Sequence, residues 1–528
     1  MSTETRTRPA PTTARHRFTD QRAVLLVSGI VYLAAALYFW RNGVIPGDST
    51  SRLANAFYTL YSRDPHLAAV GFVWNPLPSL ILLPFLPLQI LFPALIQESL
   101  LATLMSAGLM TATVGLVHSQ LRAMGVGRRS RLVLVAAYAL HPMTVLYAGN
   151  GMSEACFLLL LLLGTRGMHR WLTTGRTEAL VPLGLAIGLA YGARYEALAP
   201  VAAVPVVVAA VTWFRTAGTR QRRRQLAVTD AVIAGLPGVL AVLLWAVASK
   251  LIVDQWFATF SSEYGNSAQV RNSARFIAEA TGDTLAGRTA YWLEQLHGLA
   301  PFVLVLLVLA LVTAWRRRDP GVLAPITVLG SVLAFDTLAL LAGMSFGWLR
   351  FQIVAVPGAI LLAGYVLAGR DLAIAVPRRP AVAATLVMTL LAVPTTLLIL
   401  SQQNLSREER EWIIPAGAAR KTELTRVDTL VATDLDAMDL PDGAVLTDAA
   451  TAFAVVLASD HPKQFVITPD RDFPAAVADP AGHRVRYLLL AGEATFDAVT
   501  RAIRDPAAPP VRTWYDHYGD LHWTLVAV

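Results

Sequence analysis

The sequence predicts a polytopic α-helical membrane protein with about eleven spans and a small extracytoplasmic α/β domain at its C-terminal end. Three observations predict this fold class. The 528-residue chain is 55% hydrophobic and only 15% charged, whereas about a quarter of the residues in a soluble domain are charged. Apolar runs recur along most of the chain, and ~20 apolar residues let a helix cross a bilayer. After Ser401, short apolar runs alternate with polar segments.

The membrane domain is expected to cover residues 22–401, after a basic leader of residues 1–21. Its expected spans, with boundaries soft by ~2–4 residues, are 22–40, 98–118, 131–147, 153–168, 178–193, 196–214, 228–252, 300–315, 321–343, 350–369 and 381–401.

The basic residues indicate orientation and not a nucleic-acid partner. The formal charge of +8 is spread over short clusters between apolar runs, which is how membrane topology is encoded. The clusters are Arg6 to Arg22, Arg122 to Arg131, Arg166 to Arg176, Arg215 to Arg224, Arg316 to Arg318 and Arg370 to Arg379. Lysine is almost absent beside arginine, a bias that suggests a GC-rich bacterial genome.

One apolar segment, Asn75–Pro93, is expected to enter the membrane and return to the same side. It contains Pro76, Pro78, Pro84, Pro87 and Pro93, and each proline inside a helix costs ~3 kcal/mol. With this segment not crossing, all six basic clusters fall on one face, as the positive-inside rule requires. The N-terminus is then cytoplasmic, residues 41–97 form the first extracytoplasmic loop, and the C-terminus lies outside the plasma membrane.

The C-terminal domain, residues 402–528, is predicted to alternate strands and helices. Strands are expected at 443–449, 463–469, 485–492 and 522–528, with helices at 450–459 and 494–505. The segment "TWYDHYGDLHW" is interpreted as an edge hairpin, with sugar binding by its aromatic rings as the alternative. No Gly-rich phosphate loop or metal-ligand cluster is found in the sequence of this domain.

Two acids stand at expected exits from the membrane. Asp48 follows the first span within "GVIPGDSTSRLANAFYTL", and Glu154 follows "YAGNGMS" at the start of a later span. Either acid suits a helix start, where Asp caps well and negative charge is favourable. Either also suits acid–base chemistry at the membrane boundary.

Arginines on the extracytoplasmic side require an explanation, because they oppose the positive-inside pattern. Arg194, with Tyr195 and Glu196, lies in "YGARYEAL", and Arg350 lies in "GMSFGWLRFQ". Bound anions such as phosphate are one reason, since the guanidinium fork holds phosphate oxygens; snorkelling is the simpler one.

Four further residues complete the set of candidates. Arg52 lies in the segment of Asp48, and Trp74 and Asn75 begin the proline-rich segment; all three are candidates for substrate binding. Asp336 lies inside an expected span, where acids are usually paired or functional.

The ordered motifs "PGDSTSRLANAFY", "VWNPLPSLILLPF", "HPMTVLYAGNGMSE", "YGARYEAL" and "WLRFQIVAVPGAILL" resemble those of the GT-C superfamily, the integral-membrane glycosyltransferases that use polyprenyl-phosphate sugars. The resemblance covers about residues 22–370 and is strongest to the branch with protein mannosyltransferases and the lipid A aminoarabinose transferase. It implies that Asp48 is the catalytic base, that Glu154 is a second catalytic acid and that Arg350 contacts the lipid-linked phosphate.

The resemblance implies transfer of a mannose- or arabinose-like sugar to an envelope glycan, lipid or protein hydroxyl. No definite cofactor is indicated, and a divalent metal ion stays an option. Two other interpretations are a transporter or flippase for lipids or small anions, and a non-catalytic membrane protein that binds envelope components. No internal repeat of the kind found in many transporters is evident in the sequence.

Overall fold

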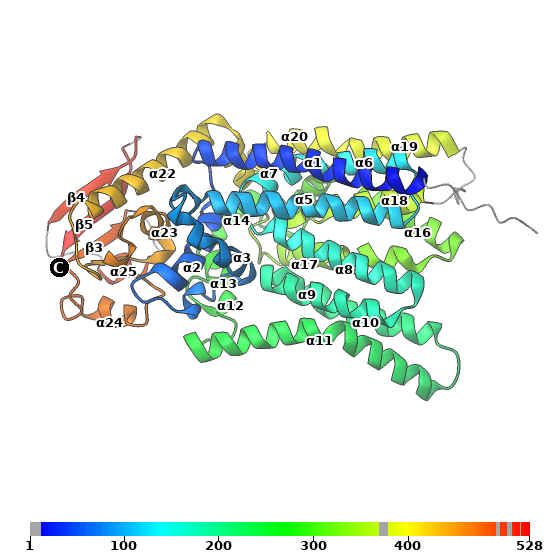
Figure 1. The fold of residues 1–528 in the computed structure, drawn as a ribbon, viewed down its shortest axis with the longest axis horizontal. Coiled ribbons are helices and arrows are strands. Elements are labelled where there is room, and N and C mark those ends of the chain that lie inside the picture. Colours follow the sequence, from blue (N-terminus) through cyan, green and yellow to red (C-terminus); the bar gives the residue numbers. More distant parts are fainter. Residues whose placement is uncertain (1–11, 369–377, 493–496, 504–508, 518) are drawn as a thin grey trace, which may run out of the picture.

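The computed structural model describes residues 12–368, 378–492, 497–503, 509–517 and 519–528. It is a long helical bundle with a domain containing a β-sheet at one end (Figure 1). The larger helices of the bundle and its outer end are α1 (Thr12–Arg41), α5 (Leu100–Ala123), α6 (Arg128–Ala139), α7 (Pro142–Gly149), α8 (Glu154–Thr174), α9 (Leu180–Ala193), α10 (Leu198–Arg215), α11 (Arg220–Val253), α15 (Leu285–Leu299), α16 (Val303–Arg317), α17 (Leu323–Leu341), α18 (Ala355–Leu367), α19 (Arg378–Leu390) and α20 (Ala392–Leu400).

Shorter helices join these elements or cover their ends. They are α2 (Gly47–Tyr61), η1 (Leu67–Val70), α3 (Leu77–Leu82), η2 (Leu83–Ile90), α4 (Ala94–Gln97), η3 (Thr177–Ala179), η4 (Tyr195–Ala197), α12 (Ala258–Ser261), α13 (Asn266–Asn272), α14 (Ala274–Thr281), η5 (Pro320–Val322) and η6 (Leu349–Gln352).

The expected spans all correspond to helices, but not all of them pass as membrane spans. In the described part of the chain, seven helices are long and apolar enough to cross a membrane, or up to nine if two bent pairs each count as one span. The remaining two expected spans are α8, which carries three charged residues, and the shorter apolar helix Thr177–Ala193. The chain is therefore a multi-pass membrane protein, with between seven and nine spans by these criteria.

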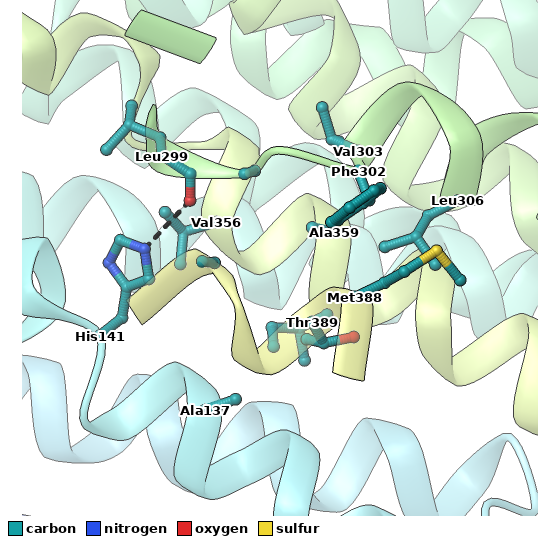
Figure 2. Close-up of a pocket in the computed structure, with 13 residues that line it drawn as sticks. Ala137, His141, Leu299, Phe302, Val303, Leu306, Val356, Ala359, Met388 and Thr389 are labelled. Atoms are coloured by element: carbon teal, nitrogen blue, oxygen red, sulfur yellow. Dashed lines mark hydrogen bonds between the residues drawn. The ribbon is translucent and has the colours of Figure 1, made fainter. Parts of the chain in front are cut away.

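One bent pair, α6 and α7, borders a small apolar cavity that is lined mainly by α16, α18 and α19 and the residues before α16. The two helices meet at 55°, and Pro142 at the start of α7 explains the break because it cannot continue the hydrogen-bond ladder. Beside the break, His141 Nε2 lies 3.1 Å from the carbonyl oxygen of Leu299 (Figure 2). The cavity measures about 10 Å³, room for one water molecule, and His141 is the one titratable side chain among its described lining residues.

The proline-rich segment begins and ends at the same end of the bundle, as predicted for a segment that does not cross. Its prolines break it into α3 and the 3₁₀ helix η2. The helix before it, α2, and the helix after it, α4, both contact α23 (Ala449–Ala458) of the C-terminal domain. The segment therefore returns to the end where it started.

The described parts of the basic clusters gather at the opposite end of the bundle (Figure 1). Neighbouring clusters are joined by contacts: Arg128 pairs with Asp20 at 2.7 Å, and Arg166 donates to Ser119 at the end of α5. Most of the predicted leader, residues 1–11, and the start of the last cluster, 369–377, lie outside the described residues.

The C-terminal domain is built on a five-stranded sheet in the order β2-β1-β3-β5-β4. Its elements are α21 (Arg407–Ile413), α22 (Pro415–Asp436), β1 (Val445–Leu446), α23, η7 (Pro462–Gln464), β2 (Phe465–Val466), α24 (Phe473–Ala478), β3 (Tyr487–Ala491), α25 (Ala498–Ala502), β4 (Pro510–Tyr515) and β5 (Leu521–Ala527). The first three strands are parallel, and β4 and β5 form the predicted antiparallel edge hairpin.

This domain and the first loop share one hydrophobic core. Leu53 and Phe57 of α2 and Leu82 of α3 pack in the same buried cluster as Val431 of α22 and Phe465 of β2. The first loop and the C-terminal domain therefore form a single cap over one end of the bundle. The sequence had indicated two separate regions.

Candidate active site

The helix α2 presents an aspartate and an arginine on one face. Asp48 and Arg52 are one turn apart, a spacing that places two side chains side by side. Arg52 donates from Nη1 to the backbone oxygen of Asp48 at 2.9 Å, and the same nitrogen lies 4.0 Å from the Asp48 carboxylate. The N-cap of α2 is Pro46, and the contacts of the Asp48 carboxylate in the described structure are with arginines. Asp48 therefore does not act as the cap that the sequence had left open.

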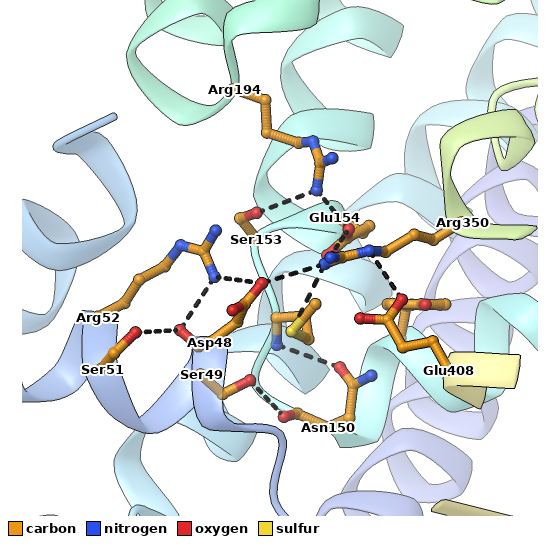
Figure 3. Close-up of polar contacts among 12 residues, drawn as sticks. Asp48, Ser49, Ser51, Arg52, Asn150, Ser153, Glu154, Arg194, Arg350 and Glu408 are labelled. Carbon is orange, nitrogen blue, oxygen red and sulfur yellow. Dashed lines mark hydrogen bonds and ion pairs between the residues drawn. The ribbon is translucent and has the colours of Figure 1, made fainter. Parts of the chain in front are cut away.

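Arg350 is brought to Asp48 by a fixed turn before α18. Gly347 adopts φ of 67°, which favours glycine, and its carbonyl accepts from Tyr291 at 2.9 Å and from Gln295 at 2.8 Å. The Arg350 guanidinium, whose residue is only 4% exposed, lies with Nη1 3.3 Å from Asp48 Oδ2 and 3.4 Å from Glu154 Oε1 (Figure 3). The ring of Trp348 lies 4.5 Å from this guanidinium.

Arg194 pairs with two buried acids. It follows the last residue of α9 in an extended conformation, and it forms ion pairs with Glu154 and Glu196. Its Nε is 2.9 Å from Glu196 Oε1. Glu154 is 1% exposed and Glu196 is 2% exposed, so two nearly dry carboxylates share this guanidinium, and Glu154 also contacts Arg350. Asp336 of α17 interacts electrostatically with Glu196 and Arg194.

The charged groups line a hollow whose other walls are aromatic and amide side chains. The described lining includes Asp48, Arg52, Trp74, Asn75, Arg194, Tyr195, Glu196, Asn266, Gln269, Phe346, Trp348, Arg350 and Phe351. Trp74 lies 4.7 Å from the guanidinium of Arg52, and Asn75 donates to the carbonyl of Tyr191 at 2.6 Å. Of the nine residues predicted as site residues, eight line this hollow, and the ninth, Glu154, touches two of its arginines.

Two acids of the site come from a segment that the sequence had indicated to be soluble. Glu408 Oε2 of α21 lies 2.9 Å from Arg350 Nε. Its neighbour Glu409 accepts from the backbone N–H of Arg350 and from the hydroxyl of Tyr147, both at 3.0 Å. Leu405, Glu409 and Trp412 have the helical spacing i, i+4 and i+7, and all three are buried in the structure. This spacing is the sequence signal that could have identified the segment.

The arginines keep Asp48 ionised. Burial alone would raise the pKa of the Asp48 carboxyl, but the positive charges of Arg350 and Arg52 outweigh it, and the pKa lies below its ordinary value. The side chain is still 28% exposed, so an incoming hydroxyl group can reach it. The site therefore holds an ionised carboxylate and a planar cation side by side, the elements needed to accept a proton and to hold an oxyanion.

A metal site is not formed by these acids. Among the described residues, no group of three or more His, Cys, Asp or Glu side chains is placed to hold a metal ion. The carboxylates of the hollow face guanidinium groups, which do not fit a shared metal ion.

The structure is similar to solved membrane-protein structures at low sequence identity. Two are ArnT from Cupriavidus metallidurans, bound to undecaprenyl phosphate (14% identity, TM-score 0.46) and in the apo state (14% identity, TM-score 0.43), and each match covers 94% of this chain and 97% of that chain. A third is the apo oligosaccharyltransferase from Archaeoglobus fulgidus (11% identity, TM-score 0.43), covering 90% of this chain and 70% of that chain. No family model and no curated protein sequence matches the chain. At these identities the likenesses assign neither a sugar nor an acceptor.

Proposed function

We propose that the protein is a membrane glycosyltransferase that moves a sugar from a polyprenyl-phosphate donor to an acceptor hydroxyl on the extracytoplasmic side. One observation carries this proposal: the Asp48 carboxylate lies 3.3 Å from the buried guanidinium of Arg350. These are the two groups that such a transfer needs beside each other. The ordered sequence motifs that resemble the GT-C superfamily support the same reaction.

In this mechanism Asp48 is the general base. Its carboxylate accepts the proton of the acceptor hydroxyl, and the acceptor oxygen forms a bond to the anomeric carbon of the sugar. The bond from that carbon to the phosphate oxygen breaks, and the lipid phosphate leaves with the electron pair. Arg350 stabilises the leaving phosphate, and Arg194 and Arg52 add positive charge nearby. When the phosphate shares these arginines, Asp48 loses part of their stabilisation and becomes a stronger base.

The remaining walls suit a sugar and a lipid. Trp74 offers an aromatic face, and Asn266 and Gln269 offer amide groups that can bond sugar hydroxyls. The apolar segment α3–η2 lies beside α2, where a polyprenyl chain would reach the site from the bilayer. We place this end of the bundle outside the cell, because the described basic clusters lie at the other end.

A donor panel tests the proposal. The purified full-length protein is incubated with several polyprenyl-phosphate sugars and a cell-envelope acceptor fraction, and the consumption of each donor and the release of polyprenyl phosphate are measured. We expect one donor to be consumed. The control variant Asp254→Asn should behave like wild type, because Asp254 is an exposed acid (91%) that pairs only with Lys250 among the described contacts. Consumption of no donor, together with movement of a labelled lipid across vesicles, would favour a transporter.

A further inference from the structure

The segment after the last span delivers an acid to the arginine that we assign to the donor phosphate. Glu408 stands in the first turn of α21, and its side chain is 14% exposed. Its Oε2 lies 2.9 Å from Arg350 Nε in an ion pair without hydrogen-bond geometry, while Asp48 and Glu154 approach Nη1 (Figure 3). An oxyanion that binds arginine through two parallel hydrogen bonds uses one edge of the fork. Since Nη1 already faces two carboxylates, a phosphate on the Nε edge would take the place of Glu408.

We propose that Glu408 determines the affinity for the donor: its carboxylate holds the place on Arg350 that the lipid-linked phosphate takes, and donor binding requires that it withdraw or accept a proton. This inference rests on the proposed function.

The charges of the site support this exchange. In the described structure, three guanidinium groups pair with the carboxyl groups of Asp48, Glu154, Glu196 and Glu408, and a fifth carboxyl group, that of Glu409, bonds the backbone of Arg350. With all of them ionised, the site carries two negative charges in excess before any phosphate arrives. A further anion beside Arg350 would be repelled, because like charges in a partly dry site interact strongly. Removing one negative charge from the Arg350 edge relieves this repulsion.

The neighbouring acid serves a different purpose. Glu409 bonds the backbone N–H of Arg350 and the Tyr147 hydroxyl, and it is fully buried. It fixes the turn that presents Arg350 and leaves the guanidinium edge alone. Of the two adjacent acids, Glu408 is therefore the one whose position a phosphate can take.

The exchange predicts a pH dependence of donor binding. The groups facing Glu408 are Arg350, Glu409, Asp48, Glu154 and Tyr147. Burial, helped by the neighbouring carboxylates, raises the pKa of Glu408 although Arg350 opposes this. Since the protonated acid does not compete with phosphate, wild-type affinity should be highest at low pH and fall as the pH rises through the raised pKa.

The test measures equilibrium binding of undecaprenyl phosphate to the full-length protein in detergent at pH 6 and pH 8. We expect Glu408→Gln to bind at least about tenfold more tightly than wild type at pH 8, with a smaller difference at pH 6. Glu408→Asp keeps the charge but withdraws it by one methylene group, so its affinity should lie between the two. Glu411→Gln is the matched control, because Glu411 is a 56% exposed acid of the same helix that pairs with Lys421.

The outcomes separate this inference from the proposed function. Equal or weaker binding by both Glu408 variants, with wild type binding and transferring sugar, would overturn the role of Glu408 and leave the proposed function intact. A wild-type protein that neither binds undecaprenyl phosphate nor consumes any donor would overturn both.

Discussion

Buried carboxylates occur in two regions of this protein, and their partners differ. At the carboxyl edge of the parallel strands, Asp448 is fully buried. It accepts hydrogen bonds from the N–H groups of Ala450 and Ala498 at 2.9 and 2.7 Å and from the hydroxyls of Thr468 and Tyr264, each at 2.6 Å. All four donors are neutral, and two of them belong to the first turns of helices. Asp448 therefore satisfies backbone and hydroxyl donors within the fold.

At the hollow, the acids instead share cations and keep unused acceptor capacity. Glu154 and Glu196 both pair with Arg194, and in the described part of the chain each retains one buried oxygen without a hydrogen-bond partner. Such groups are costly to the fold. Burial therefore does not distinguish Asp448 from the acids of the hollow, whereas the charge of their donors does.

The largest effect is expected from Asp48→Asn, which tests the reactive side of this comparison. Asparagine cannot accept the proton of the acceptor hydroxyl, so turnover should fall by about 10²–10⁴. Folding should change little, because the side chains have nearly the same shape, and donor binding should not weaken, because the variant removes a negative charge beside Arg350. Turnover under saturating donor, with thermal unfolding measured in parallel, checks this. Wild-type turnover in the variant would exclude Asp48 as the base and direct attention to Glu154.

A smaller effect is expected from Arg350→Lys. Lysine keeps the positive charge that three carboxylates require but loses the planar fork that matches a phosphate. Since one hydrogen bond to a charged group contributes about 1.5–3 kcal/mol, the KM for the donor should rise by about tenfold to a hundredfold. Arg512→Lys is a control, because Arg512 pairs with Asp434 on a half-exposed surface of the C-terminal domain. An unchanged donor KM would remove Arg350 from the phosphate site.

The smallest effect on catalysis is expected from Asp448→Asn, which tests the structural side. The amide group presents two donors of its own to a site that already holds four, so unfolding of the C-terminal domain should become easier by about 1–3 kcal/mol. Turnover measured well below the melting temperature should stay close to wild type. A loss of turnover as large as that of Asp48→Asn, without a change in melting temperature, would contradict the comparison.

The sequence predicted the apolar helices, the edge hairpin and most of the charged residues that line the hollow, because these depend on local patterns, whereas the predicted number of eleven spans is not confirmed. Apolar length identifies spans, and an acid or arginine that breaks a charge rule is visible in one dimension. The charged run "REEREW" indicated solvent, since local composition does not show that α21 turns back onto the hollow and contacts Arg350. Likewise, no local pattern showed that α2 and the C-terminal domain share a core.

That shared core has a consequence for how the protein is made. The segment that carries Asp48 leaves the ribosome early, but its packing partners in α22 and β2 are synthesised only near the end of the chain. At about 5–20 residues per second, the first loop waits on the order of tens of seconds without its cover. A chain that stops before the C-terminal domain would contain every arginine of the hollow but would lack the packing partners of α2. We expect that such a chain would not assemble the site. Completion of synthesis and acquisition of activity are thereby tied to one event, the closing of the end of the chain over its beginning.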